Sequence, residues 1–462
     1  MKDMTEGKPL SLILAFAFPL LLGNLLQQAY NVVDAAIVGR YLGANALAAV
    51  GATSSVQFLV LGFCMGVCTG FCVPIAQKFG AKDEPSMRHY IFNSVVMTAA
   101  GGGVITAACA LLTPDILRLL STPQNIYEDT RVYILVIFLG IPFTLLYNLS
   151  AGILRAVGDS KTPFVALAVS AVSNIFLDLF CIQVLHWGCA GAAIATIASQ
   201  AFSGIVCTFV ILYKYTYLRP CREEMEFRPE DCAKLLSMGL PMGFQFSITA
   251  IGSMVLQSSN NGLGSVYVSA FTAASRIKAF AMCPFDALST AVTTFCSQNY
   301  GAGKSSRIRE GYRIGNLSAV LYGIVSGAGL FVFGRASCLL FLSAQETAIL
   351  DAAGLYLKYA GCSYWLLGLL YINRTTVQGL GFSGRTVFSG VMEMFARIAV
   401  CMYMVPAAGF SGICFADPAA WIAACLYIIP ACQFTLKHVF SILPSDGAKP
   451  MGAQGKVQLA SR

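Results

Sequence analysis

Charged residues are scarce in this chain, because Asp, Glu, Lys and Arg together make up only 11% of its 462 residues. Soluble domains carry roughly 25%, since their surfaces face water. Hydrophobic residues make up 57% and the mean hydropathy is +0.70, so a water-exposed surface is excluded at this length. The apolar residues come in runs of about 20 or more, the length that crosses ~30 Å of hydrocarbon. The sequence therefore predicts an integral membrane protein.

The motifs of several enzyme classes are also missing. The chain has no GxxxxGK[ST] phosphate loop and no HExxH metal pair, so we expect no ATP site and no metal-dependent enzyme site. Its three His residues, His89, His186 and His438, are scattered. The 17 Cys show no CxxC pairing and lie mostly in apolar segments, where we interpret them as small packing residues. Without an ATP site, any energy for moving solutes across a membrane would have to come from an ion gradient or from a separate partner.

Apolar runs separated by charged residues, Gly or Pro predict twelve membrane spans. The first run, Leu10 to Val38, is too long for the core of a signal peptide and lacks a small-residue cleavage site, so we expect it to remain as the first helix. The longest polar linker, residues 214–234, divides the spans six and six. The predicted spans are 10–38, 45–75, 89–112, 130–154, 163–184, 188–213, 235–259, 265–298, 311–334, 352–378, 386–408 and 418–440.

The 30 Lys and Arg residues indicate the orientation of these spans. If the N-terminus is cytoplasmic, 21 of them fall in cytoplasmic segments, five fall outside and four lie within spans. Such an excess follows the positive-inside rule, and the reverse topology would invert it. We therefore expect both termini in the cytoplasm. The net charge of +8 reflects this orientation and requires no nucleic-acid partner.

The two halves of the chain repeat each other. At a shift of 221 residues, Gln77-Lys-Phe-Gly80-Ala81 falls on Gln298-Asn-Tyr-Gly301-Ala302, and Gly43 falls on Gly264. At a shift of 223, Arg155-Ala-Val-Gly158-Asp-Ser160 falls on Gln378-Gly-Leu-Gly381-Phe-Ser383. Because six spans return the chain to the same side, the repeats are parallel, an arrangement that suits two lobes rocking around a central cavity. We predict an all-α fold of two pseudo-symmetric six-helix lobes, residues 1–213 and 235–440, with a cytoplasmic tail at 441–462.

Ionisable side chains fall inside the predicted spans, where each costs roughly 2.5–3.5 kcal/mol on insertion scales. They are the acids Asp34, Asp178, Asp286 and Glu393 and the bases Arg276, Lys278, Arg374 and Arg397. Glu393 and Arg397 are four residues apart on one helix, so we expect them to neutralise each other. The sequence leaves the roles of Asp286, Arg276 and Arg374 open.

Asp34 and Asp178 have no basic residue near them on their own helices. Polar residues on shared helical faces accompany them: Gln27, Tyr30 and Asn31 around Asp34, Ser170 and Asn174 around Asp178, and Thr196, Ser199, Gln200 and Ser203 on the sixth span. These stripes indicate a hydrated or ion-binding interior in the first half.

Both acids also lie at a similar depth, about 8–9 Å below the outer ends of their helices at 1.5 Å per residue. They could share a proton or hold one small cation such as Na⁺, although two separately solvated carboxylates would give the same pattern. At shifts of 221 and 223 they correspond to Val255 and Cys401, so the second half lacks them. We therefore predict that the cation chemistry belongs to the N-terminal half.

In their order along the chain, these motifs resemble the MATE (multidrug and toxic compound extrusion) family, within the superfamily that also holds lipid-linked oligosaccharide flippases. The resemblance covers residues 9 to 440. Its motifs are individually loose, but in this order across twelve spans they are fairly specific. They are Pro19, Asp34 to Arg40, Gln77 to Ala81, Arg155 to Asp159, Asn174 with Asp178, and Gln298 to Ala302.

The resemblance implies an antiporter of the bacterial cytoplasmic membrane that expels amphipathic, often cationic, drugs in exchange for H⁺ or Na⁺. In the prokaryotic branch that the chain is most similar to, ion coupling is attributed to the positions of Asp34, Asn174, Asp178 and Thr196. Substrate-cavity residues are expected at Gln27, Tyr30, Asn31, Tyr133, Asn148 and Gln200, of which Tyr133 and Asn148 come from the resemblance.

Two further expectations follow from the resemblance. Pro19 matches the proline at which the first helix of the family bends, since proline removes one backbone hydrogen bond and makes bending easier. Other branches use an acid in the seventh span, but Ile251 to Leu256 contains none. C-lobe coupling of that kind is therefore missing here.

Three other functions are in competition. A flippase for a lipid-linked envelope precursor would suit Arg276, Arg374 and Arg397, which could bind a pyrophosphate headgroup, but the acidic first half argues against it. A membrane receptor would not need the doubled six-helix architecture, and an intramembrane enzyme would need a nucleophile–base pair or metal set that we do not find. We expect a monomer without cofactor, ATP or nucleic acid, whose partners are small-molecule drugs and the lipid bilayer.

Overall fold

The computed structural model describes residues 3–120 and 122–443, nearly all of them helical. The α-helices of this part of the chain are α1 (Pro9–Tyr41), α2 (Ala44–Gly80), α3 (Glu84–Leu119), α4 (Tyr127–Leu139), α5 (Ile141–Ala156), α6 (Lys161–Leu179), α7 (Gly188–Tyr213), α8 (Pro229–Asn261), α9 (Ser265–Gly301), α10 (Ser305–Ser337), α11 (Thr347–Gly379), α12 (Ser383–Ala399), α13 (Val405–Ala408) and α14 (Phe410–Ile442). Two π-helical turns, Phe180–Val184 and Val400–Met404, extend α6 and α12.

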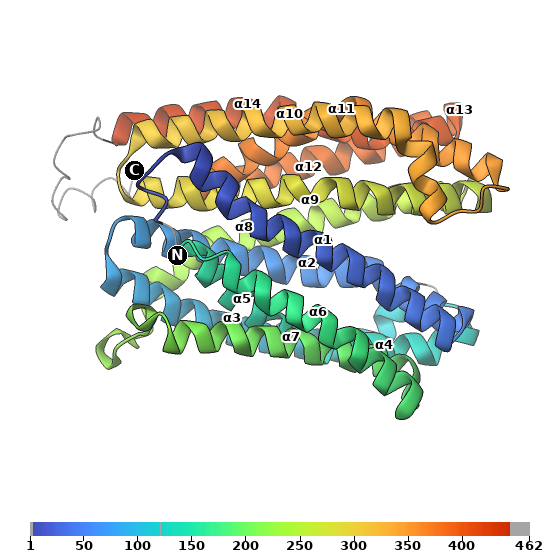
Figure 1. Cartoon of the computed structure of the whole chain (residues 1–462), viewed down its shortest axis with the longest axis horizontal. Coiled ribbons are helices and arrows are strands. Elements are labelled where there is room, and N and C mark those ends of the chain that lie inside the picture. The colour runs from blue at the N-terminus through green and yellow to red at the C-terminus, as the bar shows by residue number, and fades with distance from the viewer. Residues whose placement is uncertain (1–2, 121, 444–462) are drawn as a thin grey trace.

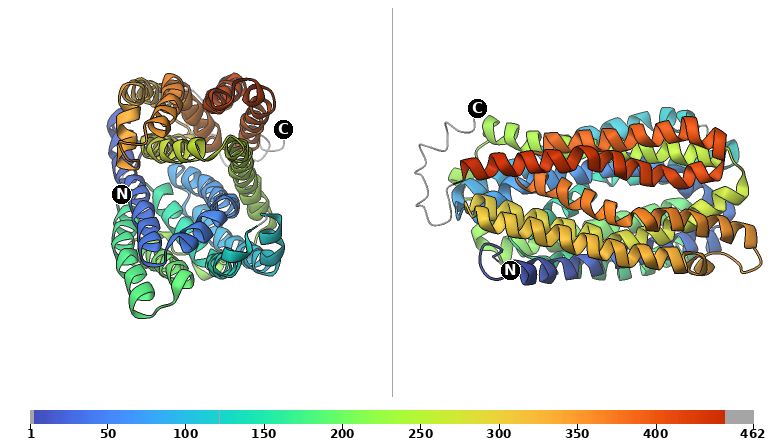
Figure 2. Two further views of the ribbon diagram at one scale, coloured as in Figure 1. Left: turned by 90° about the vertical axis from the view of Figure 1, so that its right-hand side faces the viewer. Right: turned by 90° about the horizontal axis from the view of Figure 1, so that it is seen from above.

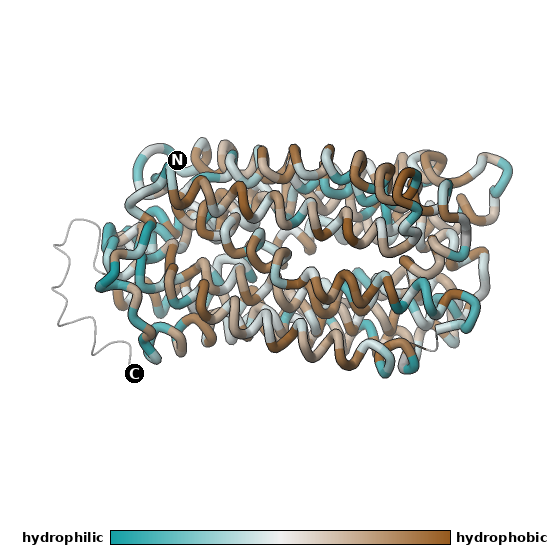
Figure 3. The backbone as a smooth tube through the Cα atoms, turned by 90° about the horizontal axis from the view of Figure 1, so that it is seen from below, coloured by the Kyte–Doolittle hydropathy of each residue, from teal (hydrophilic) through white to brown (hydrophobic). Residues whose placement is uncertain are grey.

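The described helices form twelve membrane-crossing segments, as predicted. Ten segments are long and apolar enough to cross a membrane, and α4 with α5, bent by 43°, makes an eleventh. The twelfth is α11, whose 33 residues rise about 50 Å at 1.5 Å per residue. More than half of its residues are buried, so it needs less apolar surface than a lipid-facing helix. Polar residues gather at the two ends of the bundle and apolar ones between them (Figure 3).

Several predicted boundaries are wrong by five residues or more: α3 is Glu84–Leu119 rather than 89–112, α8 starts at Pro229 rather than at 235, α10 at Ser305 rather than at 311 and α14 at Phe410 rather than at 418. The fourth span is also broken, at Gly140. The predicted twelfth span starts after the charged Asp417, whereas Asp417 and Pro418 both lie inside α14. Hydropathy reports only the stretch in hydrocarbon, whereas these helices continue past it. The predicted tail, 441–462, lies outside the described residues from 444 onward.

The helices are arranged in two groups, the N-lobe (α1 to α7) and the C-lobe (α8 to α14), shown side by side in Figure 1. Both ends of the described chain lie at the same end of the bundle, which we call the terminal end; the opposite end is the far end. Figure 2 shows the two groups in the end-on view. Gly43 and Gly264, the paired glycines of the repeat, begin α2 and α9 with φ of 89° and 107°, which explains why both are Gly.

The first helix bridges the two lobes. Ile13, Phe16 and Leu20, near the terminal end of α1, are part of the C-lobe core. Ile37 and Val38, near its far end, pack instead in an N-lobe cluster. Pro19 is buried in the half that contacts the C-lobe, and α1 runs through it without a break. Any bending at Pro19 would therefore alter the contact between the lobes.

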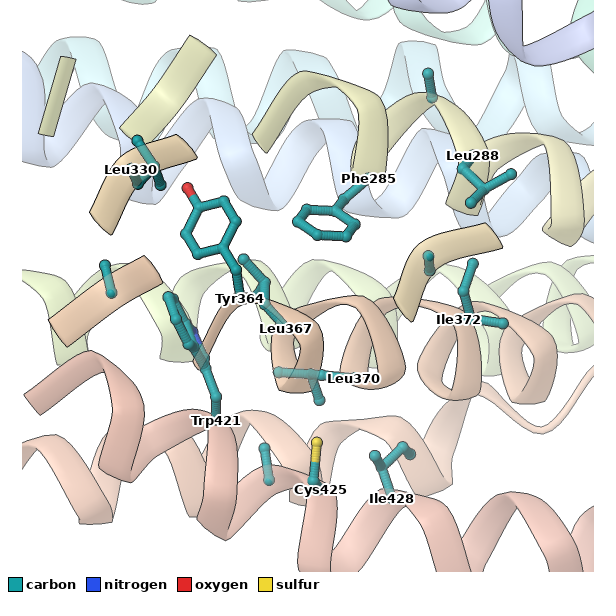
Figure 4. Close-up of a cluster of buried hydrophobic side chains, with 14 of the residues drawn as sticks. Phe285, Leu288, Leu330, Tyr364, Leu367, Leu370, Ile372, Trp421, Cys425 and Ile428 are labelled. Atoms are coloured by element: carbon teal, nitrogen blue, oxygen red, sulfur yellow. The ribbon is translucent and has the colours of Figure 1, made fainter. Parts of the chain in front are cut away.

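The C-lobe core is built around α11. Phe285 of α9, Tyr364 of α11 and Trp421 of α14 form a chain of ring contacts, each with 5.8 Å between centroids (Figure 4). Phe285 and Tyr364 are almost completely buried. This packing makes the C-lobe a rigid support for the polar groups described below.

The lobes meet over the half of the bundle nearer the terminal end. Gly66 and Gly70 of α2 pack against the backbone of α8 at Gly243 and Gly239. The contact continues to Ser247, whose hydroxyl donates to the Leu59 carbonyl at 3.4 Å. Beyond this pair, toward the far end, no hydrogen bond or ring contact joins the lobes within residues 3–120 and 122–443. The hydrogen bonds and ring contacts that join the lobes in the described part of the chain therefore lie toward the terminal end.

Candidate ion and substrate site

Two carboxyl groups meet in the N-lobe, near the far end. Asp34 lies on α1 and is half-buried, whereas Asp178 lies in the last turn of α6 and is fully buried. The two groups are close enough for a protonated one to donate a hydrogen bond to the other. No base is among the groups that interact with either of them. The structure thus brings together the two acids that sequence reasoning paired.

Two tyrosines flank the acid pair. Tyr30, one turn before Asp34, contacts Gln27 and interacts electrostatically with both carboxyl groups. Tyr133 of α4 is buried and also interacts with both. Its hydroxyl contacts Gln57 of α2, a residue that sequence reasoning missed. Gln57 follows Thr53, Ser54 and Ser55 on α2 with no acid nearby in sequence, so only its packing against α4 reveals it.

Many polar atoms at this site have no partner in the protein. In the described part of the chain, fourteen buried side-chain N or O atoms make no hydrogen bond, and seven of them lie here. They belong to Asp34, Asn174, Asp178, Ser199 and Gln200. Buried polar groups normally find a partner, because an unmade hydrogen bond costs roughly 1–3 kcal/mol. These atoms therefore form a site that a proton, water or a small cation can complete.

The other predicted site residues occupy different places around the pair. Asn174 is buried one turn before Asp178, and its side-chain amide has no partner. Thr196 and Gln200 lie half-buried on α7, which packs against α6. Asn31 is half-buried on α1. Asn148 of α5 donates to the Thr144 carbonyl of its own helix at 2.8 Å, while Tyr147 beside it interacts with Tyr30.

Five charged residues of the C-lobe, Lys278, Arg374, Glu393, Arg397 and Asp417, form one continuous chain of ion pairs. Lys278 and Arg397 both pair with Asp417, and Arg397 and Arg374 both pair with Glu393. The Nη2 atom of Arg397 lies 3.2 Å from Asp417 Oδ1, and its Nη1 lies 3.6 Å from Glu393 Oε2. Each of the two acids is thus held between two bases.

The expected Glu393–Arg397 pair is present, but it is part of this larger chain. Asp417 was missed because the predicted twelfth span began one residue after it. Tyr356 of α11 completes the acid's shell: its hydroxyl accepts from Lys278 at 2.6 Å and donates to Asp417 at 2.6 Å. Asp286 of α9 stands apart from the chain and contacts the Tyr371 hydroxyl.

The two lobes are therefore chemically different. A proton or Na⁺ can neutralise the N-lobe pair, where carboxylate and amide oxygens, the ligands that hard cations prefer, are free. The acids of the C-lobe chain are already neutralised by three fixed cations. Asp34 and Asp178 thus have carboxylate oxygens without a protein partner, whereas Glu393 and Asp417 are each held by two bases.

Comparison with known proteins identifies the family to which the chain belongs. Residues 19–180 and 241–403 each match the MatE family model, which also confirms that the two halves are repeats. The chain is 32% identical over 380 residues to the probable multidrug resistance protein YpnP of Bacillus subtilis strain 168, covering 82% of this chain and 84% of that protein. It is 31% identical over 395 residues to the probable multidrug resistance protein YoeA of the same organism, covering 82% and 83%.

A solved structure has the same fold. The outward-facing conformation of a multidrug resistance MATE family transporter superposes with a TM-score of 0.87 at 22% identity. The superposition covers 95% of this chain and 98% of that one.

Proposed function

Because the chain belongs to the MatE family of membrane transporters, we propose that it is a cation-coupled antiporter which exports amphipathic, often cationic, compounds. The coupling ion is H⁺ or Na⁺, and it binds at Asp34 and Asp178. Asn174 and Thr196 assist this binding. Gln27, Tyr30, Asn31, Tyr133, Asn148 and Gln200 line the path of the substrate.

One observation carries this proposal: the N-lobe holds two neighbouring carboxyl groups that interact with each other and with no base, whereas the two acids of the C-lobe chain each contact two bases. Uncompensated acids within a membrane are costly and mark ion or proton pathways. Asp34 is half-buried, and the hydrogen bonds that join the lobes lie toward the terminal end, which supports access to the acid pair from the far end.

The geometry suggests how exchange proceeds. In the state open at the far end, an entering ion neutralises the acid pair and removes its attraction for a cationic substrate, which then leaves. The neutral pair tolerates the drier environment of the closed state, because burial disfavours charge. Reopening at the terminal end releases the ion and lets new substrate bind.

Charge distribution supports placing the terminal end in the cytoplasm of a bacterium, since positively charged residues are retained there. Lys304 and Arg307 lie at this end and bind the N-terminal segment. We propose that the protein works as a monomer in the cytoplasmic membrane, because each chain contains both lobes and the complete acid pair.

The test is ethidium export from proteoliposomes under imposed gradients. The protein is purified, reconstituted in defined lipid and given a pH gradient, then a sodium gradient of equal magnitude. We expect export to follow one of them and to vanish when that gradient is collapsed by an ionophore. Export that ignores both gradients would overturn the coupled mechanism.

A flippase is the alternative, and the ion pairs argue against it. Arg374 and Arg397, which could bind a pyrophosphate, are already paired with Glu393 and Asp417. Deletion of the gene from its host should therefore raise ethidium sensitivity without an envelope defect. An envelope defect with unchanged ethidium accumulation would favour the flippase.

A further inference from the structure

Two glutamines at the terminal end each donate a hydrogen bond to a backbone carbonyl of the opposite lobe, at equivalent positions of the repeat. The amide of Gln77, on α2 of the N-lobe, donates to the Gly379 carbonyl at the end of α11 at 3.1 Å. The amide of Gln298, on α9 of the C-lobe, donates to the Ala156 carbonyl at the end of α5 at 2.8 Å. The donors differ by 221 residues and the acceptors by 223, the two shifts of the internal repeat. The bonds are thus related by the pseudo-twofold axis.

Paired glycines bring the two donor helices into contact. A Cβ atom on Gly80 would collide with the Gln298 carbonyl, and one on Gly301 would collide with the Gln77 carbonyl. The last turns of α2 and α9 therefore cross backbone to backbone. This close crossing leaves each glutamine within reach of the opposite lobe and explains why both repeats have Gly three residues after Gln.

The N-terminal segment reinforces one of the two bonds. The Met4 amide donates to Gln298 Oε1 at 2.9 Å, so both ends of that side chain are bound. Arg307 and Asn299 both donate to the Met4 carbonyl, and Lys304 donates to the Thr5 carbonyl at 2.8 Å. Met4 and Gln298 are completely buried. Gln77 is half-buried, and in the described part of the chain its Oε1 accepts no hydrogen bond like the one that Met4 donates to Gln298.

We propose that Gln77 and Gln298 are the positioning residues that hold the cytoplasmic side of the transporter shut, and that the segment Asp3 to Gly7 acts as a clamp on Gln298. The proposal rests on the transport function above and adds the residues that set its conformational equilibrium. Both bonds join opposite lobes, so opening to the cytoplasm must break both. Neither residue touches the acid pair, and their effect on export comes through the population of the closed gate.

Gln298 makes more contacts that hold the lobes together than Gln77 does. Gln77 makes one bond across the lobes, whereas Gln298 joins the opposite lobe and the clamp together. Losing the Gln77 bond leaves the clamp in place. Losing the Gln298 side-chain amide breaks the bond to Ala156 and also releases the Met4 N–H, which weakens the clamp, so it should open the gate more readily.

Hydrogen exchange of the full chain in lipid nanodiscs tests whether the Gln77 and Gln298 hydrogen bonds, which together we call the latch, hold the lobes closed. The variants are Gln77→Met, Gln298→Met and both together, which keep the length of the side chain and remove the amide. Gln433→Met is the matched control, because Gln433 lies on α14, near the same end of the bundle, and donates to Tyr312 within the C-lobe. A typical hydrogen bond is worth about 1 kcal/mol net, so each lost latch bond should speed exchange at the gate about fivefold.

The expected result is faster exchange in both lobes, in peptides spanning 153–158 and 376–381, with Gln298→Met exceeding Gln77→Met and with Gln433→Met unchanged. Deleting residues 3–7 should reproduce the Gln298→Met pattern. Unchanged exchange in the double variant would overturn the latch. So would acceleration confined to the substituted lobe, or acceleration that extends through the whole protein. Ethidium export by the wild type, measured separately, decides the transport function itself.

Discussion

Arg397 donates from Nε to Asp417 at 3.3 Å, joining α12 to α14 inside the C-lobe. The contact matters because Arg397 is shared: its other side faces Glu393. Three bases and two acids in this chain leave one positive charge in excess. In a buried ion network the group that is removed decides whether the remaining charges balance. The C-lobe network can therefore be tested residue by residue.

Asp417→Asn should destabilise the protein strongly, by about 3–5 kcal/mol, because it leaves Lys278 and Arg397 without their shared acid. Arg397→Leu should cost less, since Lys278–Asp417 and Arg374–Glu393 remain as two balanced pairs. Thermal unfolding in detergent measures the order. Adding Lys278→Met to Asp417→Asn removes the stranded cation and should recover part of the loss. Equal melting temperatures for both single variants would contradict this account.

Unlike Asp417→Asn, which should destabilise the protein, Asp178→Asn should abolish export without loss of stability. Its carboxylate oxygens accept no hydrogen bond from a protein donor, and an amide in their place removes a buried charge. Export of ethidium should fall by about tenfold or more for Asp178→Asn and for Asp34→Asn, because intramembrane acids of this kind carry the coupling ion. Proteoliposome flux at matched protein density is the measurement.

The matched control for both variants is Asp115→Asn, which makes the same change at the exposed Asp115–Arg118 pair on α3. It should leave both export and melting temperature unchanged, since exposed ion pairs contribute little. Wild-type export by either site variant would remove Asp34 and Asp178 from the mechanism.

The sequence predicts much of this architecture because membrane proteins follow simple physical rules. Twelve apolar runs, the Gln–Gly repeats and the Asp34–Asp178 pair are all visible without coordinates. In each case the signal is local: hydrocarbon thickness sets the length of a run, and a charge inside a run is conspicuous. The structure confirms the all-helical membrane fold, although not every span boundary, and brings the two acids together.

Features that depend on contacts between helices were not predictable. Asp417 fell outside its span because a charged residue was expected to separate apolar runs, and the Arg374–Glu393 pair joins residues 19 positions apart on different helices. Gln57 has no sequence neighbour that reveals its contact with Tyr133. The crossing of α1 from one lobe core to the other is also a matter of packing, since its apolar residues suit either lobe equally.

Gly80→Ala should disturb the closed cytoplasmic side, because its methyl group would meet the Gln298 carbonyl. Overpacking of this kind costs roughly 1–3 kcal/mol. Gly103→Ala is the matched control: it lies within α3, where a Cβ meets no atom within 4 Å, and should gain about 0.5–1 kcal/mol from helix propensity. Melting temperatures should therefore move in opposite directions. A Gly80→Ala protein as stable as the control would show that the two helices do not cross this closely.

The linker before α8 should resist release by acid. Outside the membrane, Arg88 binds Glu224 through two bonds of 2.7 and 2.8 Å. These bonds lower the pKa of Glu224 to about 2. A lowered pKa stabilises the docked linker above the ordinary Glu pKa of about 4.3, and this stabilisation disappears as the pH falls through the folded value. The linker should therefore remain docked at pH 4 and detach near pH 2.

Pepsin, which cuts in this pH range, provides the measurement. Cleavage within residues 214–228 should rise in the wild type only as the pH approaches 2, whereas in Arg88→Gln it should rise already near pH 4, because Glu224 then titrates normally. Arg131→Gln, which breaks the exposed pair with Glu128 at the far end, serves as the control and should follow the wild type. If wild type and Arg88→Gln release the linker at the same pH, the Arg88–Glu224 contact does not hold the linker in place.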